Sequence, residues 1–313
     1  MKLLRDISEL GTLPGALHLA IGVFDGLHLG HQAVIGAAQL AAREQGGTVV
    51  VVTFDPHPIE VLSPRHAPRL LSAPEHKLVL LERELGVRHC WVIPFDLDRA
   101  GQTGAEFIGG LLAATGPGRL AGIYVGEQWR FGQNRSGDLA LLETLGVTGG
   151  FVAVGLATVE IEGAPVSSTR IREAIGAGDF AVAKRLLGRD YTVYGTVVEG
   201  RRLGRTIGFP TANLRVHREQ LPPTGVYAVR ATGRGDGWNG VANLGYRPTV
   251  SGDATERLLE VHLFDFVGDI YGEVLEVEFV EFLRAERKFA GVEELKAQIA
   301  RDAGAARAVV SGR

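Results

Sequence analysis

The feature that most constrains the fold of this chain is a change in the spacing of its apolar residues near position 188. Before that point, short apolar runs typical of buried strands alternate with segments of helical spacing, as in Leu17–Val23 followed by Gln32–Glu44. After it, strand-like segments follow one another, and a helical pattern returns only at Val292–Ala308. With 313 residues the chain is long enough for two domains of different class, which we place at residues 1–187 and 188–313.

The alternating half predicts a parallel sheet with helices on both faces, because strand–helix–strand units cross over with one hand. The expected strands are Leu17–Val23, Thr48–Phe54, His89–Ile93, Leu120–Val125 and Phe151–Val154. The expected helices between them are Gln32–Glu44, Pro74–Leu85, Gly104–Ala114 and Asp138–Leu145. Ligands of such sheets bind at the carboxyl ends of the strands, so the loops at those ends are the candidates for function.

The second half predicts a small antiparallel barrel or sandwich with one terminal helix. Its expected strands, separated by turn-like clusters, are Tyr191–Glu199, Gly225–Ala231, Trp238–Leu244, Leu258–Phe264 and Val274–Phe282. Arg172–Gly188 is expected to be a short helical connector.

Composition excludes several classes of function. Cys90 is the only cysteine, so no intramolecular disulfide or cysteine-based metal cluster can form, and its apolar neighbours favour a buried thiol over a nucleophile. No apolar run approaches the ~18 residues of a membrane span, and the net charge of −3 argues against general nucleic-acid binding. We therefore expect a cytoplasmic protein that is a monomer or weak homo-oligomer.

The loop Gly22–His31 follows a buried strand and opens a helix. Its glycines would let the backbone turn beneath a phosphate chain, and the helix N-terminus favours anions. His28 and His31 can present imidazole N–H donors that stabilise charge during phosphoryl or nucleotidyl transfer. A Gly-rich turn with incidental histidines is the alternative. The spacing fits neither the dinucleotide fingerprint nor a zinc-protease motif.

Three further polar segments leave expected strands or begin a helix. They are Thr53–Pro58, the run Gly126–Asp138, and Ser167–Arg172, whose hydroxyls and guanidiniums suit the outer phosphates of a nucleotide. Each segment alone is a weak signal, and Ser-Ser-Thr is usually only a helix cap.

Taken with the His-Leu-Gly-His loop, these segments resemble the nucleotidyltransferase superfamily, and in particular the FMN adenylyltransferase module of bacterial bifunctional riboflavin kinase/FAD synthetases. The resemblance implies that the phosphate of FMN attacks the α-phosphate of ATP, giving FAD and pyrophosphate. It implies catalytic roles for His28 and His31. It also implies ATP and phosphate contacts by Gly22, Phe24, Asp25, Gly26, Gly30, Ser168, Thr169 and Arg170. Flavin contacts are implied for Asp55, His57, Gln128, Trp129, Arg130 and Phe131. Gln128 departs from the family, which more often has Asp or Asn there.

A second constellation lies in the β-rich half. The segment Gly200–Asn213 combines glycines with arginines and contains no Walker motif, so a P-loop kinase is excluded. Thr211 and Asn213 are hard oxygen ligands suited to Mg²⁺ beside phosphates. In the expected strand that contains it, Glu260 shares one face with His262, and a carboxylate inside or at the mouth of a barrel can accept a hydroxyl proton. A solvent-facing glutamate is the alternative.

These segments, with Pro223–Tyr227, Asn243–Gly245, Pro248-Thr249 and Leu283–Phe289, resemble the riboflavin kinase module in the same order. The resemblance implies that Thr211 and Asn213 hold Mg²⁺ and nucleotide, that Gly204 and Gly208 contact ATP, and that Glu260 is the catalytic base. The implied fold is α/β, a Rossmann-like nucleotidyltransferase domain followed by a small antiparallel β-barrel of the riboflavin kinase type with a C-terminal helix.

The resulting hypothesis is a bifunctional enzyme that phosphorylates riboflavin to FMN and adenylylates FMN to FAD, with ATP and Mg²⁺ in both steps. One alternative is a nucleotidyltransferase acting on a different phosphate. Another is a flavin-binding regulatory module without turnover. The joint presence of His28, His31, Thr211, Asn213 and Glu260 argues against both alternatives.

Overall fold

The structure is a computed structural model that describes residues 1–200, 204, 207–248 and 255–311. By their contacts, residues 1–68 and 74–168 form one compact unit, and Arg69–Ala73 with Thr169–Arg313 forms a second. Among the described residues, no helix has the length and apolar character needed to cross a membrane. Each unit is described below by itself.

The N-terminal unit is built on a parallel sheet with the order β1-β4-β3-β2-β5-β6. Its strands are β1 (Lys2–Leu4), β2 (Leu17–Ile21), β3 (Thr48–Asp55), β4 (His89–Pro94), β5 (Leu120–Gly126) and β6 (Val152–Leu156). The predicted parallel sheet is confirmed. β1 was not predicted, because three residues carry too little periodicity to be recognised.

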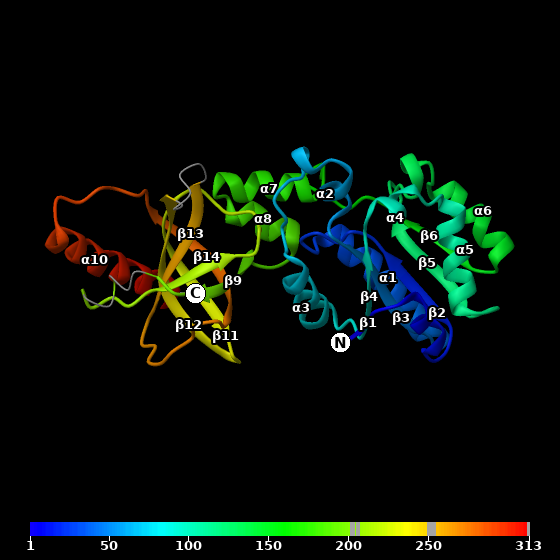
Figure 1. Cartoon of the computed structure of the whole chain (residues 1–313), viewed down its shortest axis with the longest axis horizontal. Helices are drawn as coiled ribbons and strands as arrows, with labels where there is room; N and C mark the ends of the chain where they lie inside the picture. The colour runs from blue at the N-terminus through cyan, green and yellow to red at the C-terminus, as the bar shows by residue number, and fades with distance from the viewer. Residues whose placement is uncertain (201–203, 205–206, 249–254, 312–313) are drawn as a thin grey trace. The chain divides into compact units, whose positions relative to one another are not determined.

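Helices cover both faces of this sheet (Figure 1). They are α1 (Leu29–Gln45), α2 (Pro58–Leu62), α3 (Pro74–Leu85), α4 (Leu97–Gly101), α5 (Gly104–Thr115) and α6 (Leu139–Gly149). One apolar cluster joins Ala20 of β2 to Ile35 of α1 and Leu80 of α3. The other joins Leu19 of β2 to residues of α5 and α6. Adjacent residues of β2 thus serve opposite cores, as the two-residue period of a strand requires.

The order of the strands reverses beside β2. From β2 the chain runs outward through β3 and β4 on one side, whereas β5 and β6 lie on the other. A parallel sheet opens a crevice at the carboxyl ends of the strands that flank such a point. The loop after β2, the end of β3 and the loop after β5 meet at this edge, and they are the segments predicted to be functional.

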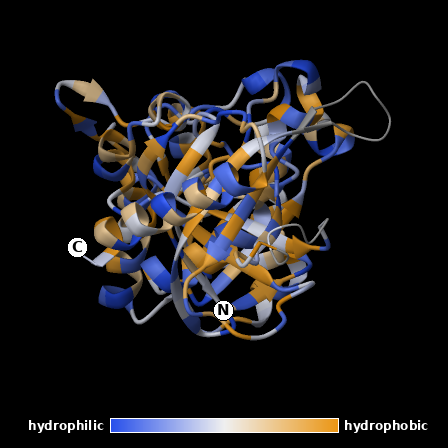
Figure 2. Cartoon of the chain, turned by 90° about the vertical axis from the view of Figure 1, so that its left-hand side faces the viewer, coloured by the Kyte–Doolittle hydropathy of each residue, from blue (hydrophilic) through white to orange (hydrophobic). Residues whose placement is uncertain are grey.

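The C-terminal unit contains a closed antiparallel barrel with the order β10-β13-β12-β11-β14-β9. Its strands are β9 (Thr192–Val198), β10 (Ala212–Val216), β11 (Gly225–Gly233), β12 (Asp236–Pro248), β13 (Thr255–Leu263) and β14 (Val274–Arg284). The predicted barrel is confirmed, whereas β10 was not predicted because its five residues include Asn213 and Arg215 and show no clear alternation. The hydrophobic residues of the strands are orange in Figure 2.

Further helices are α7 (Ser168–Ala177), α8 (Phe180–Leu187) and α10 (Val292–Ser311). α10 packs its apolar residues Ala306 and Val310 against β11 and β12. The ring of Phe180 in α8 stacks on Phe279 of β14 with centroids 5.9 Å apart. The contact of Phe180 places α8 beside the barrel, and α7 from Thr169 onward belongs to the same unit. The domain boundary at residues 187 and 188 rests on the change in apolar spacing and stays a prediction.

Two bidentate Arg–Asp pairs fasten α10 to the barrel, and they differ in burial. Arg284 Nε and Nη2 donate to Asp302 at 2.7–3.1 Å, with side chains 22% and 8% exposed. Arg307 donates to Asp265 at 3.0 Å, with side chains 51% and 79% exposed. Removal of one partner leaves a charge without compensation, and this costs more where water cannot reach it.

We therefore expect Asp302→Asn to lower the free energy of unfolding of the C-terminal unit by about 2–3 kcal/mol. The matched variant Asp265→Asn should cost less than about 1 kcal/mol. Urea unfolding followed by Trp238 fluorescence, in a Trp91→Phe/Trp129→Phe background, measures both. Equal losses in the two variants would contradict the assigned role of burial.

Candidate active sites

The loop between β2 and α1 has an unusual backbone that the surrounding protein holds in place. Phe24, Gly26 and Leu27 have φ values of 52°, 81° and 47°. Two of these are non-glycine residues in the left-handed region, which costs about 1–3 kcal/mol each unless the surroundings fix it. The loop carbonyls supply this fixation. Thr53 Oγ1 donates to Val23 O at 2.9 Å, Ser168 Oγ to Asp25 O at 3.0 Å, and Gln32 Nε2 to Leu27 O at 2.8 Å.

The two histidines of the loop lie against each other at the start of α1. Their rings stack with centroids 3.6 Å apart and an interplanar angle of 18°. His28 is the N-cap, and its Nδ1 accepts from the backbone N–H of His31 at 3.4 Å. In a neutral His28 the ring proton is therefore on Nε2, where it is a donor. The pair thus brings two imidazoles to a helix N-terminus that already favours anions.

His31 is held in its neutral form. Its Nδ1 is buried and has no hydrogen-bond partner among the residues that the structure describes. Burial lowers the pKa of His31 well below its ordinary value, and the positive charges of His28 and Lys77 lower it further. A neutral imidazole keeps one N–H donor, which is sufficient to bind a phosphate oxygen.

Glycines leave the space that the aromatic rings occupy. A Cβ on Gly30 would lie 3.1 Å from His28 Cε1, and one on Gly22 would lie 2.9 Å from the ring of Phe24. Phe24 in turn packs edge-on against His31, with centroids 5.4 Å apart. The glycine pattern therefore positions the histidine pair as well as allowing the turn.

The residues predicted to contact flavin lie at the exits of β3 and β5. Asp55 ends β3, and burial raises the pKa of its carboxyl. His57 caps α2. Trp129 and Phe131 stack with centroids 4.4 Å apart, and Phe131 belongs to the hydrophobic core. Gln128 precedes Trp129, and Arg130, which is exposed, lies between Trp129 and Phe131 in the chain.

The helix that carries the hydroxyl and guanidinium groups crosses the border between the two units. Ser168 belongs to the N-terminal unit and contacts the His28 loop through Asp25 O. Thr169 and Arg170 belong to the C-terminal unit. Of the predicted hydroxyls, Ser168 is the one that the structure brings to the loop.

The C-terminal unit has a cavity of about 550 Å³ lined by polar residues of three neighbouring strands. Glu260 of β13 pairs with Asn213 of β10 on one side and with Asn243 of β12 on the other. Directly opposed residues of antiparallel strands have Cβ atoms about 4.5–5.5 Å apart. Glu260 therefore stands between two asparagines in one row, and all three line the cavity.

The cavity lies on the outer face of the barrel. Leu259 and Val261, the neighbours of Glu260, point to the other face and are fully buried. α10 packs outside the strands (Figure 1). Its residues Leu295 and Ile299 line the cavity. The expectation that the carboxylate lies inside or at the mouth of the barrel is therefore wrong, because apolar side chains fill so narrow an interior.

The loop before β10 forms another wall of the cavity. Gly204, Phe209 and Thr211 line it, and the N–H of Phe209 donates to Gly204 O at 2.8 Å. Gly208 has a φ of 89°. His262 Nδ1 donates to Pro210 O at 2.7 Å and so ties this loop to β13. Arg201, Arg202, Arg205 and Thr249, which belong to the predicted motifs, lie outside the described residues.

Sequence reasoning missed two charged residues near these sites. Lys77 of α3 is 7% exposed and contacts the His28 loop, and Asp302 of α10 pairs with Arg284 at the cavity. Each is a charged residue within an amphipathic helix, where a solvent-facing position is the usual interpretation. Cys90 is buried as predicted, and burial raises the pKa of its thiol to about 12.

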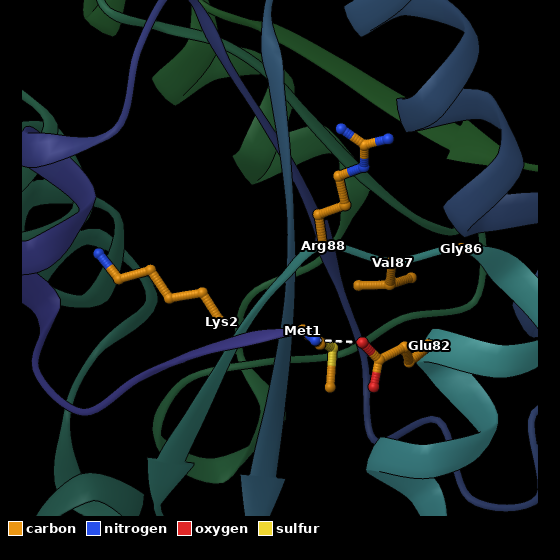
Figure 3. A pocket seen from close by; sticks show the side chains of 6 residues that line it. All are labelled: Met1, Lys2, Glu82, Gly86, Val87 and Arg88. Atoms are coloured by element: carbon orange, nitrogen blue, oxygen red, sulfur yellow. Dashed lines mark hydrogen bonds and ion pairs between the residues drawn. The ribbon is translucent and has the colours of Figure 1, made fainter.

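A further hollow of about 380 Å³ lies beside Met1, where the terminal amino group pairs with Glu82 (Figure 3). It is lined by Lys2 and Arg88, which are at or before the amino ends of β1 and β4. This is the opposite edge of the sheet from the carboxyl ends where ligands bind. None of the predicted site residues lines it.

Comparison with known proteins assigns both halves of the chain to known families. The family model described as FAD synthetase matches residues 13–170, and the one described as riboflavin kinase matches residues 187–310. A bifunctional riboflavin kinase/FMN adenylyltransferase of Pseudomonas fluorescens is 40% identical over 311 residues, 99% of this chain and 98% of that protein. The chain belongs to the bifunctional riboflavin kinase/FMN adenylyltransferase family.

The protein of the same name from Escherichia coli K12 is 41% identical over 305 residues, 96% of each chain. A solved structure titled "Crystal Structure of Macrolide-efflux Protein from Streptococcus pneumoniae" is 32% identical, with a TM-score of 0.81 over 96% of both chains. That title names a different activity, and the likeness to this structure is one of fold. The predicted bifunctional enzyme is confirmed by both family models, with riboflavin, FMN and ATP as substrates and FMN and FAD as products.

The geometry of the barrel cavity makes Gly200 a sensitive position if riboflavin is phosphorylated there. A Cβ there would lie 2.1 Å from Asn213 Nδ2 and 2.6 Å from its Cγ, so Gly200→Ala must displace the Asn213 side chain. We expect riboflavin phosphorylation to fall about tenfold or more, because small displacements in a site are costly. FMN adenylylation in the same protein should not change.

The matched control is Gly237→Ala in the same barrel, where the nearest atom to a Cβ is Thr232 Cγ2 at 3.8 Å. Steady-state rates of both reactions measure the effect. Kinase rates that fall equally in the two variants would show that the Asn213 position is not what matters.

Proposed function

We propose that the two activities of this chain are carried out at two separate sites, each within one half of the chain. FMN adenylylation takes place at the carboxyl edge of the parallel sheet, around His28 and His31. Riboflavin phosphorylation takes place in the barrel cavity, around Glu260. The observation that carries the proposal is the row formed by Asn213, Glu260 and Asn243 in a cavity made wholly from residues of the C-terminal unit.

In the adenylyl transfer, a phosphate oxygen of FMN attacks the α-phosphorus of ATP, and the bond to the bridging oxygen of pyrophosphate breaks. No covalent intermediate with the protein is needed. His28 and His31 bind phosphate oxygens through imidazole N–H groups and stabilise the charge that develops there. The fixed backbone of the Phe24–Leu27 turn and the N-terminus of α1 add donors that need no reorganisation during the reaction. Gly22, Gly30 and Ser168 position these groups.

The flavin of FMN is assigned to the segments that leave β3 and β5 at the same edge of the sheet. Asp55 and His57 come from β3, and the segment Gln128–Phe131 comes from β5. Thr169 and Arg170 are assigned to the ATP phosphates, because hydroxyl and guanidinium groups are strong phosphate ligands. These assignments rest on the positions that the residues share with the family motifs.

In the kinase reaction, the Glu260 carboxylate accepts the proton of the ribityl 5′-hydroxyl as its oxygen attacks the γ-phosphorus of ATP. The bond to the bridging oxygen of ADP breaks, so the products are FMN and ADP. A general base of this kind contributes about 10²–10⁴-fold to the rate. The neighbouring asparagines supply amide groups on either side of Glu260.

The residues of the cavity fit a magnesium ion. Thr211 immediately precedes β10 and Asn213 lies within it, and both residues line the cavity and carry neutral oxygen atoms. Among the described residues, no group of three or more His, Cys, Asp or Glu side chains could hold a metal. Mg²⁺ usually takes only one or two protein ligands and completes its shell with phosphates and water. Bound there, it would neutralise charge on the phosphates of ATP.

The two sites should be separable by mutation. Glu260→Gln removes the base while keeping the shape, so we expect it to stop FMN formation from riboflavin and to spare FAD formation from FMN. His28→Ala/His31→Ala should do the reverse. Chromatography of the products from riboflavin or FMN with ATP and Mg²⁺ measures each step.

Each variant is the folding control of the other, because the step that it retains reports an intact chain. Loss of both activities in a folded Glu260→Gln protein would contradict separate sites. Binding of flavin without any product in the unmodified protein would favour the alternative of a module without turnover.

The assigned magnesium ligands predict a selective metal requirement. Thr211→Val removes one oxygen ligand and keeps the shape of the side chain, so the kinase should need about tenfold more Mg²⁺ for half-maximal rate. Adenylylation should keep its Mg²⁺ requirement, because Thr211 lines the barrel cavity and is not among the residues assigned to that reaction. Rates measured across a Mg²⁺ titration test this. Unchanged requirements in both reactions would remove Thr211 from the metal site.

That the protein is cytoplasmic, and a monomer or weak homo-oligomer, stays a prediction.

A further inference from the structure

Lys77 of α3 is a buried cation for which the assigned mechanism has no role. It is 7% exposed, and its Nζ donates to Val23 O at 2.8 Å and to Thr53 Oγ1 at 3.4 Å. Lysine is almost never buried to this degree unless its charge is compensated. Burial lowers the pKa of Lys77, and the negative charges of Asp25 and Asp55 oppose that shift.

The carbonyl that Lys77 contacts is the entry to the left-handed turn of the nucleotide loop. Val23 immediately precedes Phe24, whose φ is 52°, and its carbonyl accepts from both Lys77 Nζ and Thr53 Oγ1. A backbone in this region persists only where the surroundings determine it. Lys77 is thus one of the groups that hold the turn from within the protein.

Lys77 also acts on His31 through its charge. His31 packs against Phe24 and His28 of its own loop. The positive charge of Lys77 lowers the pKa of His31, and no partner for its buried Nδ1 is found among the described residues. Asp25 of the loop, Asp55 of β3 and Cys90 of β4 act on Lys77 in turn. A cation at this place opposes protonation of the imidazole.

We propose that Lys77 is a positioning residue of the adenylyl-transfer site, which fixes the Val23 carbonyl with its ammonium group and so holds the turn that leads to the histidine pair. Its positive charge in addition opposes protonation of His31. The proposal rests on the assignment of FMN adenylylation to the His28 and His31 loop. Lys77 itself does not touch the nucleotide. It acts through the backbone of the turn and through the imidazole.

The test compares Lys77→Met with Thr53→Val in the full-length chain. Lys77→Met removes both the charge and its hydrogen bond to Val23 O, whereas Thr53→Val removes the other donor to Val23 O and the 3.4 Å contact with Lys77 but keeps the charge. We expect Lys77→Met to lower kcat for FMN adenylylation about ten- to a hundredfold. Thr53→Val should have a smaller effect, and riboflavin phosphorylation should be unchanged in both variants, which shows that each chain is folded.

The decisive measurement is the titration of His31. In Lys77→Met its pKa, followed by NMR of the imidazole C–H signals, should rise, because the repulsion from the ammonium is gone. The acid limb of the adenylylation rate should move to higher pH with it. Thr53→Val should leave both where they are in the unmodified protein. If Lys77→Met does not fold, Lys77→Gln removes the charge while keeping a donor, and the same shift is expected.

A His31 pKa and an acid limb that do not move in the charge-removing variant would overturn the proposal. This outcome can be told apart from a failure of the site assignment itself. If His28→Ala/His31→Ala retains FAD formation, the assigned site is wrong. If that double variant is inactive while the variant without the Lys77 charge behaves as the unmodified protein, only the role of Lys77 is wrong.

Discussion

The proposed kinase site depends on the register of β13 with its two neighbours. Glu260 stands between Asn213 and Asn243 because the backbone hydrogen bonds of three strands align these positions, and a shift of one residue would turn Glu260 to the apolar face. The same register places Leu259 and Val261 in the interior. The free energy that closes the barrel therefore also fixes the carboxylate, and the site needs few contacts of its own.

In the proposed adenylyltransferase site, a loop rather than a strand positions the reactive groups. Its backbone is held by carbonyl contacts with Thr53, Gln32 and Ser168, and its histidines are stacked at the start of α1. Because the carbonyls are turned toward protein donors, the turn and the helix N-terminus can offer donors to a phosphate. In both units the reactive groups are thus positioned by backbone geometry, which suits reactions that depend on positioning and charge stabilisation.

Much of the fold could be predicted from local patterns in the sequence. The apolar runs of β2 to β6 and the alternation of the barrel strands depend on neighbours in the chain, and they predicted both folds. The glycines around His28 are a local signal as well, and with the family resemblance they gave the candidate site residues. The short strands β1 and β10, the row around Glu260 and the buried Lys77 and Asp302 depend on pairing across the fold. Nothing near Lys77 in the sequence distinguishes it from a lysine on an exposed helix face. The outer position of the kinase cavity likewise follows only from how α10 packs.

If the two sites are separate, FMN made at the kinase site of one protein molecule can be used at the adenylyltransferase site of another. Glu260→Gln protein lacks the kinase step and His28→Ala/His31→Ala protein lacks the adenylyl step, so neither alone should convert riboflavin to FAD. An equimolar mixture of the two, supplied with riboflavin, ATP and Mg²⁺, should form FMN first and then FAD. A mixture that forms FMN but no FAD, although the Glu260→Gln protein converts added FMN, would contradict independent sites linked by free FMN.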